Sequence, residues 1–304
     1  MITILGPTAS GKTSLAVATA CAINAEIISA DSRQVYRRMD IGTGKDLAEY
    51  AVNGSIVPHH LINICEPGEK YNLFRFQHDF HTAYDNIRSR GKRPVLCGGS
   101  GLYLEAALKG YSLPEVPANH SLREELKGKT ISELADILST YKTPHNTTDV
   151  DTPQRAIRAI EIEEYIKARP TASQDYPPTP SIVIGIQIDR EQRRQRIGQR
   201  LRERLEAGMV DEARRLMDSG LTADDLIYYG LEYKFLALHI TNRISLAEMT
   251  VQLETAICQF AKRQMTWFRG MERRGIPIRW LDALLPLEDK VRIIQNILKQ
   301  TNHD

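Results

Sequence analysis

The sequence predicts an α/β protein: a P-loop NTPase-like, doubly wound parallel sheet with a mostly helical inserted domain. Three observations support this fold class. The stretch "GPTASGKT" at 6–13 lies between a short apolar run and a helix-compatible segment. Apolar runs of strand length alternate with segments of helical periodicity. This alternation stops near residue 110 and resumes near residue 180.

Four apolar runs have the length of buried parallel strands, and a glycine or an aspartate follows each of them. The runs are 2–5, 26–30, 94–97 and 182–188. Helix-compatible stretches at 13–23 and 73–89 separate the first three runs. Strand, helix and strand at this spacing form the βαβ pattern of a doubly wound sheet.

The region between the third and fourth runs predicts a separate domain. We expect residues 1–110 and 180–304 to form the P-loop core with C-terminal helices, and 111–179 to form a helical insertion. Inside the insertion, Thr130 and Glu133 have the spacing of a capping box, and 154–168 has helical periodicity.

The C-terminal third is helical by pattern. Apolar residues recur every three or four positions and predict one buried helical stripe, made of Ile197, Leu201, Leu205, Met209, Ala213 and Leu216. Ser245 and Glu248 predict the cap of a long helix that reaches Arg269. A last helix is expected over 288–299.

Composition excludes several classes of protein. Of the 304 residues, 42% are hydrophobic, yet no apolar run approaches the roughly 20 residues of a membrane span. Since no basic leader precedes the first apolar run, we expect a cytoplasmic protein with no membrane partner. The cysteines lack a CxxC pair and are expected to be reduced core residues, namely Cys21, Cys65, Cys97 and Cys258. His59 and His60 are expected to pack or hydrogen-bond, because no second metal ligand follows at the required spacing.

The glycine-rich stretch matches the G-x-x-x-x-G-K-[ST] pattern in full. In such a loop, backbone N–H groups converge on phosphate oxygens at the positive end of a helix, Lys12 adds a charge, and the Thr13 hydroxyl reaches a bound Mg²⁺. The alternative is a glycine turn that only caps a helix. The pattern favours a polyanion site formed by Gly6, Thr8, Ala9, Ser10, Gly11, Lys12 and Thr13.

Asp31 directly follows the second predicted strand, so we expect it at the carboxyl edge of the sheet, near the phosphate loop. Two interpretations stay open from the residues alone. Asp31 or Ser32 could be a helix N-cap, or Asp31 could act as a general base beside a substrate. The loop "CGGSGLY" at 97–103 comes to the same edge, either as a binding loop or as a tight turn.

Basic residues gather in three clusters. The first is a predicted cationic ridge of Arg193, Arg196, Arg200 and Arg204. The second is Gln154, Arg155 and Arg158, and the third is Lys262, Arg263 and Arg269, with Trp267 and Phe268 among them. Each cluster is either a solvated helix face or a contact for a polyanionic partner.

Six motifs in this order resemble those of the tRNA dimethylallyltransferases, also called tRNA isopentenyltransferases. They are "GPTASGKT", "EIISADSRQVYRRMDIGTGK", "VPHHLI", "RGKRPVLCGGSGLYL", "TPQRAIRAIE" and "FAKRQMTWFRG", and the resemblance extends from residue 1 to about 282. It implies transfer of a dimethylallyl group from dimethylallyl diphosphate to N6 of adenosine 37 in tRNA. The phosphate loop would then hold a prenyl diphosphate and Mg²⁺ in place of ATP.

The resemblance also implies roles for individual residues. Asp31 would accept a proton from the adenine amine, while Lys12 and Thr13 would act on the diphosphate. The insertion would grip the anticodon stem-loop, and the enzyme would act as a monomer. The implied tRNA contacts are Asp31, Ser32, Arg33, Gln34, Ser100, Arg123, Gln154, Arg155, Ala156, Ile157 and Arg158.

Some positions depart from the usual family pattern. Ser100 replaces threonine, and Asn63 replaces aspartate. Gly44 and Asp46 replace the alanine and the proline of the typical "GTAKP" motif. Leu231 and Glu232 replace an aromatic and a basic residue in the segment 228–236, whose role is therefore open.

Two other functions remain to be weighed. One is a P-loop small-molecule kinase that uses ATP. The other is a non-catalytic RNA-binding module, which leaves a complete phosphate loop beside Asp31 without a purpose.

Overall fold

The computed structural model describes residues 1–141, 150–169, 173–174 and 176–301. The chain divides into two compact units, one of Met1–Lys109 with Pro178–Asp304 and the other of Gly110–Pro177. Each unit has its own hydrophobic core. None of the described helices combines the length and the apolar character that a bilayer crossing requires.

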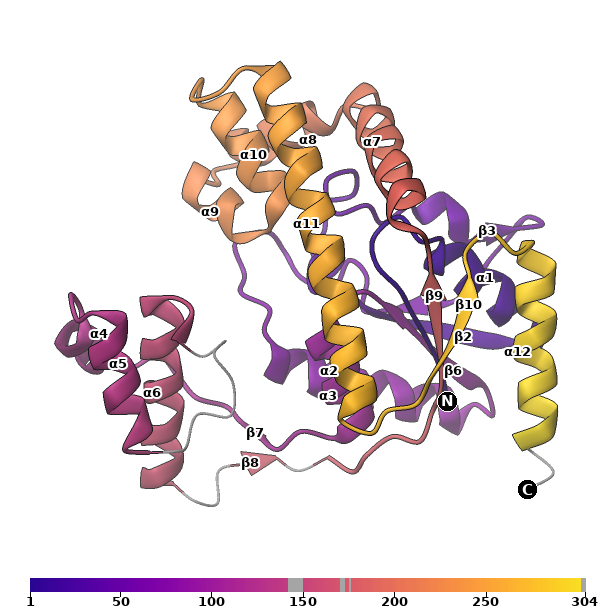
Figure 1. Ribbon diagram of the computed structural model, residues 1–304, viewed down its shortest axis with the longest axis horizontal. Helices are drawn as coiled ribbons and strands as arrows, with labels where there is room; N and C mark the ends of the chain where they lie inside the picture. The colour runs from indigo at the N-terminus through magenta and orange to yellow at the C-terminus, as the bar shows by residue number, and fades with distance from the viewer. Residues whose placement is uncertain (142–149, 170–172, 175, 302–304) are drawn as a thin grey trace. The chain divides into compact units, whose positions relative to one another are not determined.

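The larger unit contains a parallel sheet of six strands in the order β10-β9-β1-β6-β2-β5 (Figure 1). Its strands are β1 (Ile2–Leu5), β2 (Ala25–Ala30), β5 (His59–His60), β6 (Arg93–Gly98), β9 (Ile182–Gln187) and β10 (Ile278–Asp282). The four predicted strands are confirmed, with ends that move by at most one residue. The prediction missed β5 and β10. In β5, the His60 Nε2 atom donates a hydrogen bond to the carboxylate of Glu26 at 2.9 Å, which confirms its expected structural role.

Helices cover both faces of this sheet, which confirms the doubly wound fold. They are α1 (Lys12–Ile23), α2 (Leu73–Ser89), α3 (Gly101–Lys109) and α12 (Leu287–Thr301). On one face, Leu15 of α1 and Ile294 of α12 share a core with Ile2 and Ile27. On the other face, α2 and α3 pack against Ile28 and Leu96. Between β2 and α2 lie a short 3-10 helix, η1 (Leu47–Tyr50), and the hairpin of β3 (Ala51–Val52) and β4 (Ser55–Ile56).

Five further helices follow β9: α7 (Arg190–Glu206), α8 (Met209–Asp218), α9 (Ala223–Tyr228), α10 (Leu231–Ile240) and α11 (Leu246–Arg273). The predicted stripe is wrong in one respect, because it spans two helices. Gly208 interrupts them with a left-handed φ of 93°. Five stripe residues are buried, and Leu205 packs against the same cluster. The apolar spacing therefore predicted which residues are buried, but not the interruption of the helix at Gly208. The capping box of Ser245 and Glu248 is confirmed.

The smaller unit contains α4 (His120–Leu126), α5 (Ile131–Ser139) and α6 (Pro153–Ala168), with an antiparallel pair of β7 (Leu113–Pro114) and β8 (Ser173–Gln174). Its core consists of Leu126, Leu134, Leu138, Ala156, Ala159 and Ile160. The predicted capping box of Thr130 and Glu133 starts α5. Thr152 caps α6, and Pro153 occupies its first turn, where no amide donor is needed.

The four cysteines are free thiols, as expected. Cys65 and Cys97 are buried, whereas Cys258 is only partly buried. Cys21 is exposed, so its predicted place in the core is wrong. It lies in the last turn of α1, whose apolar composition suggested a helix that is buried all round.

Candidate active site

The phosphate loop has the backbone shape of an anion cradle. Ala9 and Gly11 adopt left-handed φ angles of 60° and 83°. A Cβ atom on Gly6 would come within 2.5 Å of the Ser10 Oγ atom, so only glycine lets the loop fold back on itself. No side chain caps the N-terminus of α1, and its first turn carries no acidic residue. The first amides of α1 and the positive end of its dipole are therefore oriented for an anion.

Lys12 is a cation in surroundings that disfavour its charge. Burial lowers the pKa of its amine, and the nearby Arg200 and Arg204 lower it further, although Cys97 and Asp31 act in the opposite direction. A desolvated amine beside two guanidinium groups is stabilised by a bound anion. Burial also raises the pKa of Cys97 to about 12, so this neighbouring thiol stays neutral.

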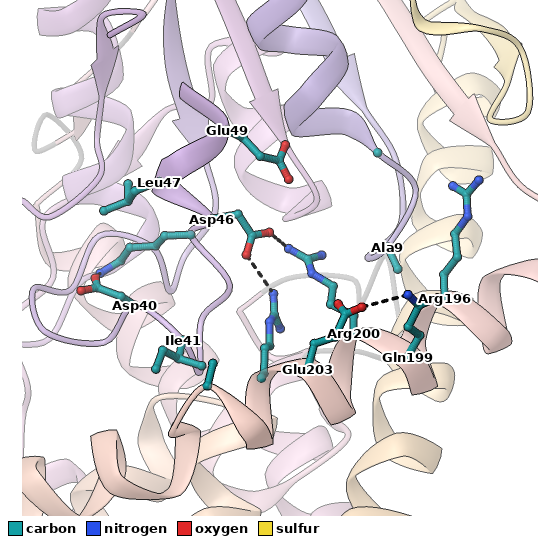
Figure 2. Close-up of a pocket in the computed structure, with 14 residues that line it drawn as sticks. Ala9, Asp40, Ile41, Asp46, Leu47, Glu49, Arg196, Gln199, Arg200 and Glu203 are labelled. Atoms are coloured by element: carbon teal, nitrogen blue, oxygen red, sulfur yellow. Dashed lines mark hydrogen bonds and ion pairs between the residues drawn. The ribbon is translucent and has the colours of Figure 1, made fainter. Parts of the chain in front are cut away.

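A pocket of about 650 Å³ lies against the phosphate loop (Figure 2). It is lined by Ala9 and Gly11 of the loop, by residues 40–49, and by one side of α7. The α7 residues include Arg196, Arg200 and Arg204, which the sequence analysis interpreted as part of a ridge. The helix therefore directs three basic side chains toward the phosphate loop.

Arg200 and Arg204 are not a solvated helix face. Their side chains are 30% and 16% exposed, and both pair with the carboxylate of Asp46. The Arg204 Nη2 atom lies 3.9 Å from the Asp46 Oδ1 atom. Burial lowers the pKa of Arg200 to about 10, and repulsion from Arg204 contributes. The single carboxylate thus faces two crowded cations.

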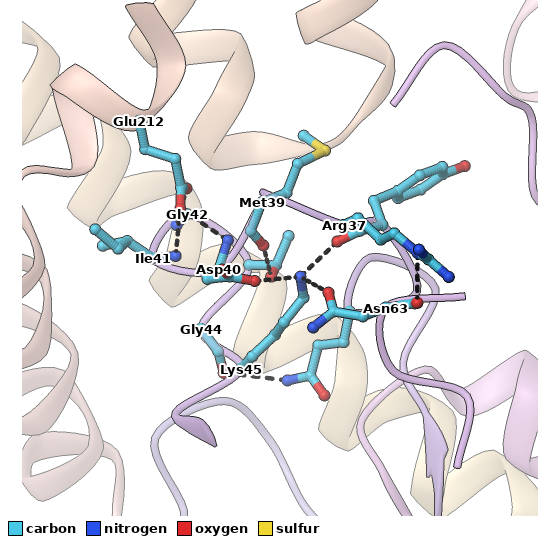
Figure 3. Close-up of polar contacts among 12 residues, drawn as sticks. Arg37, Met39, Asp40, Ile41, Gly42, Gly44, Lys45, Asn63 and Glu212 are labelled. Carbon is cyan, nitrogen blue, oxygen red and sulfur yellow. Dashed lines mark hydrogen bonds and ion pairs between the residues drawn. The ribbon is translucent and has the colours of Figure 1, made fainter. Parts of the chain in front are cut away.

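Glu212 of α8 fixes the loop that forms one wall of the pocket (Figure 3). Its carboxylate accepts hydrogen bonds from the backbone N–H groups of Asp40, Ile41 and Gly42 at 2.8, 2.8 and 2.9 Å. Tyr233 donates its hydroxyl to the same carboxylate at 2.6 Å. The four donors leave Glu212 well satisfied, so we expect it to hold the loop and not to react.

Lys45 anchors the same loop through its side-chain amine. Its buried amine donates to the backbone oxygen of Tyr36 and, at 2.6 Å each, to the side chains of Asp40 and Asn63. Burial lowers the pKa of Lys45, and the carboxylate of Asp40 partly restores it. Asn63 keeps an acceptor oxygen for Lys45 although aspartate is usual in the resembling motif.

The structure excludes the helix-cap interpretation of Asp31, because a series of turns follows β2 at this point. The Asp31 Oδ1 atom instead accepts the N–H of Arg33 at 2.9 Å. Its charge influences the pKa values of Lys12, Arg200 and Arg204. Asp31 therefore lies in the same electrostatic environment as the basic residues of the pocket.

Ser32, Arg33 and Gln34 occupy this turn beside two other loops. The Ser32 N–H donates to the Ser100 Oγ atom at 3.2 Å, so the predicted serine contact is used within the protein. Gln34 donates to the Gly44 carbonyl at 3.1 Å and links the turn to the pocket wall. The turn thus connects both loops that flank Asp31.

The divergent segment 228–236 lies against this turn. The Arg33 guanidinium is 5.4 Å from the ring centroid of Tyr228, and its Nε atom is 3.3 Å from the position of a Cβ atom on Gly230. Burial raises the pKa of Glu232, which also senses Arg204 and Asp31. The segment therefore supports the turn and borders the site despite its unusual sequence.

Gln264 of α11 is a site residue that sequence reasoning missed. Its side chain is buried, accepts the Thr8 N–H at 2.9 Å and donates to the Gly99 carbonyl at 2.9 Å. A Cβ atom on Gly99 would lie 2.5 Å from the Gln264 amide nitrogen, so this loop needs glycine there. A signal was present, because Gln264 is the polar member of the otherwise apolar stripe of Leu253, Ile257, Ala261 and Phe268.

The candidate tRNA contacts of the smaller unit have different surroundings. Arg123 and Arg158 both pair with Glu161, and Arg123 does so at 3.0 and 2.9 Å. Burial alone would raise the pKa of Glu161, but hydrogen bonds from the two arginines lower it to about 2. The three side chains therefore form an internal ion-pair network.

The start of α6 holds the other candidates. Gln154 and Arg155 are exposed, and Arg155 forms a 2.9 Å ion pair with Asp151. Ile157 is partly buried. Ala156 is fully buried in the core of the unit, so its side chain offers no contact to tRNA. The side chain points inward because α6 places this position against the core of the unit.

No group of three His, Cys, Asp or Glu side chains that could hold a metal ion occurs in the described part of the chain. A magnesium ion at a phosphate loop needs few protein ligands, because phosphate oxygens and water complete its octahedral shell. Thr13 follows Lys12 at the start of α1, the place in the phosphate-loop motif from which a hydroxyl would reach the ion.

Two family models match the chain. The model described as IPP transferase covers residues 34–271, and the model described as Isopentenyl transferase covers residues 1–54. Among curated relatives, tRNA dimethylallyltransferase 1 of Parabacteroides distasonis is 62% identical over 298 residues, 98% of this chain and 97% of that protein. tRNA dimethylallyltransferase 2 of Phocaeicola vulgatus is 60% identical over 302 residues, with 99% and 98% covered.

Solved structures of similar fold come from the same group. The full-length tRNA isopentenylpyrophosphate transferase of Bacillus halodurans has a TM-score of 0.72 and 33% identity, and the match covers 98% of this chain and 95% of that one. A eukaryotic dimethylallyltransferase acting on tRNA has a TM-score of 0.71 at 23% identity, covering 93% and 73%. The second likeness supports the fold.

Proposed function

The chain belongs to the IPP transferase family, whose curated relatives here are tRNA dimethylallyltransferases, and on this premise we propose its reaction. It transfers a dimethylallyl group from dimethylallyl diphosphate to N6 of adenosine 37 in tRNA and releases diphosphate. The observation that carries this proposal is the proximity of two chemistries. Arg200 and Arg204 lie close enough to Lys12 to lower the pKa of its amine, and Asp31 lies within their electrostatic reach.

The donor side would stabilise the leaving group. As the allylic C–O bond breaks, negative charge grows on the diphosphate, and the loop amides, Lys12 and Arg200 neutralise it. The Thr13 hydroxyl would help to hold Mg²⁺, which would supply further charge neutralisation. Because Lys12 and Arg200 are partly desolvated before the donor arrives, they need little reorganisation to bind it.

The acceptor side would remove a proton. The lone pair of the adenine amine is delocalised into the ring, so attack requires a group that accepts the N6 proton as the C–N bond forms. Asp31 is a carboxylate at the carboxyl edge of the sheet, and the hydrogen bond that it accepts from the Arg33 N–H leaves lone pairs available. The target base must leave the anticodon-loop stack to reach it, and the Arg33 and Tyr228 pair offers a flat surface beside the path.

The smaller unit would bind the anticodon stem through its exposed polar groups, with the enzyme acting as a monomer. Gln154 and Arg155 are the candidates for direct phosphate contact, since both are exposed at the start of α6. Arg123 and Arg158 would support this surface, because Glu161 already pairs with both.

Incubation of the protein with labelled dimethylallyl diphosphate and unmodified tRNA tests the proposal. Label is expected in tRNA, at N6 of adenosine 37. Hydrolysis of ATP without labelled tRNA would favour the small-molecule kinase instead. Binding of tRNA without turnover would favour a non-catalytic RNA-binding module.

A further inference from the structure

The carboxylate of Asp46 occupies a position in the pocket that suits an anionic ligand. It pairs with the guanidinium groups of Arg200 and Arg204, and Figure 2 shows it facing Arg200. The same pocket is bordered by Ala9 and Gly11 of the phosphate loop. Asp46 itself is 31% exposed, and its backbone φ of 46° lies in the left-handed region. It is thus a charged group near the surface and not a packed core residue.

One carboxylate does not satisfy both arginines. Asp46 approaches Arg200 closely, but its separation from Arg204 is 3.9 Å. The Nε atom of Arg204 is buried and has no hydrogen-bond partner among the described residues. Buried donors without partners are rare in native proteins. Arg204 therefore retains capacity for an anion larger than a carboxylate.

Gly44 makes the position of Arg204 possible. A Cβ atom at this residue would lie 1.7 Å from the Arg204 Nη2 atom and 2.5 Å from its Cζ atom. The carbonyl of Gly44 is held by Gln34, so the backbone has little freedom to move away. Any larger residue at position 44 would push the guanidinium group out of the pocket.

We propose that Arg204 is a second arginine of the donor's diphosphate site, and that Asp46 is an internal anion that the diphosphate displaces. This inference rests on the proposed function and refines its donor site. A diphosphate carries more charge and more acceptor oxygens than one carboxylate, so it satisfies Lys12, Arg200 and Arg204 together. In this proposal Gly44 leaves space for the Arg204 side chain, and Asp46 pairs with it until the diphosphate binds.

Binding of inorganic diphosphate with Mg²⁺, measured by calorimetry, tests the role of Arg204. Arg204→Ala should weaken binding about tenfold, the loss expected for one charge-assisted contact. Gly44→Ala should cause a similar loss by displacing Arg204. The double variant should bind no more weakly than either single variant. Unchanged affinity in Arg204→Ala would overturn the proposal, as would fully additive losses.

Gly54→Ala is the matched control for Gly44→Ala. Gly54 has a left-handed φ of 77°, and a Cβ atom there meets nothing within 4 Å. This variant introduces the same backbone strain and should leave diphosphate affinity unchanged. Melting temperatures establish that each variant is folded. Arg204→Gln, which keeps most of the side-chain volume, repeats the measurement if Arg204→Ala unfolds.

Asp46→Asn tests the internal anion. Removing the competing charge should tighten diphosphate binding about tenfold. Glu203→Gln is the control, because Glu203 lines the same pocket but bonds to Gln199 at 2.8 Å, so its gain should be clearly smaller. Weaker binding in Asp46→Asn would overturn the displacement, since Asp46 would then orient the arginines or bind the metal.

A parallel transfer assay separates this inference from the proposed function. If the unmodified protein fails to prenylate tRNA, the function is refuted, while the diphosphate measurements still decide the role of Arg204. If it prenylates tRNA and the variants bind diphosphate normally, only the inference is refuted.

Discussion

The two units of the molecule treat similar arginine pairs in opposite ways. In the smaller unit, Arg123 and Arg158 share Glu161, which is 1% exposed and has both oxygens engaged. In the larger unit, Arg200 and Arg204 share the partly exposed Asp46, and Lys12 adds a third charge nearby. The network around Glu161 is complete within the protein, whereas the network around Asp46 leaves the Arg204 Nε–H group without a hydrogen-bond partner among the described residues. The comparison teaches that arginine spacing alone does not separate structure from binding.

The largest effect is expected from Asp31, the carboxylate beside the incomplete network. Asp31→Asn should lower the single-turnover rate of prenyl transfer by about 10² to 10⁴, the usual contribution of a positioned base. Asparagine can accept the Arg33 N–H in the same turn, so the melting temperature should change little. A rapid Asp31→Asn enzyme in rapid-quench measurements would remove the base from the mechanism.

Replacing Lys12 tests whether the network of Lys12, Arg200, Arg204 and Asp46 takes part in the reaction. Lys12→Ala should weaken transfer by about 10² to 10³, as expected when one stabilising donor is removed from a developing oxyanion. Because the lysine is a desolvated cation near two arginines, its removal should leave the melting temperature unchanged or higher. The measurement is transfer at subsaturating donor, together with thermal unfolding.

Arg123→Ala provides the contrasting variant in the smaller unit. It leaves the buried Glu161 with one arginine fewer, so thermal stability should fall while diphosphate affinity stays unchanged. A variant of Arg123 that loses diphosphate affinity at full stability would break the comparison between the two units.

Glu161 should make the complete network visible through pH. Its pKa of about 2 lies below the ordinary value of 4.5, so its contribution to stability is present above pH 4.5 and is lost as the pH falls toward 2. Glu161→Gln should cost about 2 kcal/mol of unfolding free energy near neutral pH, the scale of a few charge-assisted hydrogen bonds. Denaturant titrations should show the difference between variant and wild type shrinking over that window. A difference independent of pH would contradict the assignment.

The smallest effect is expected from exposed charges of the smaller unit. tRNA affinity should fall with salt, by about 0.7 to 0.9 in log affinity per log salt for each phosphate contact. Arg155→Ala should reduce this slope by about one contact, whereas Lys127→Ala, at an exposed pair with Glu124, should leave it unchanged. An unaltered slope in Arg155→Ala would assign Arg155 to its local pair with Asp151.

The sequence predicted the parts of this molecule that depend on local pattern. The phosphate loop, β1, β2, β6 and β9 were found because buried parallel strands are continuous apolar runs with turn residues after them. β5 has only two residues, and β10 contains the exposed Arg279 and Asp282 among its apolar residues, so neither carried that pattern. Gly208 was missed because apolar spacing continues through it.

The candidate site was predictable only in part, because its electrostatics depend on partners far apart in the chain. Asp31 directly follows β2, and Lys12 lies at the end of the loop that follows β1, where α1 begins, so the topology of the sheet located both. Arg200 forms an ion pair with Asp46, and Arg123 forms one with Glu161, although each partner lies far away in the sequence. No local sequence pattern predicts such pairings. For this reason Arg196, Arg200 and Arg204 were predicted as a surface ridge, whereas in the structure they line a pocket.

Gln264 connects the phosphate loop to the loop that follows β6. Its amide fixes the Thr8 N–H and the Gly99 carbonyl, so both loops acquire their shape when α11 folds against the sheet. Ordering a loop at the moment of binding would cost conformational entropy and weaken affinity. Here the hydrogen bonds from Gln264 form when the protein folds, so both loops are held in place before a substrate binds. Loosening α11 should therefore slow substrate capture from both sides at once.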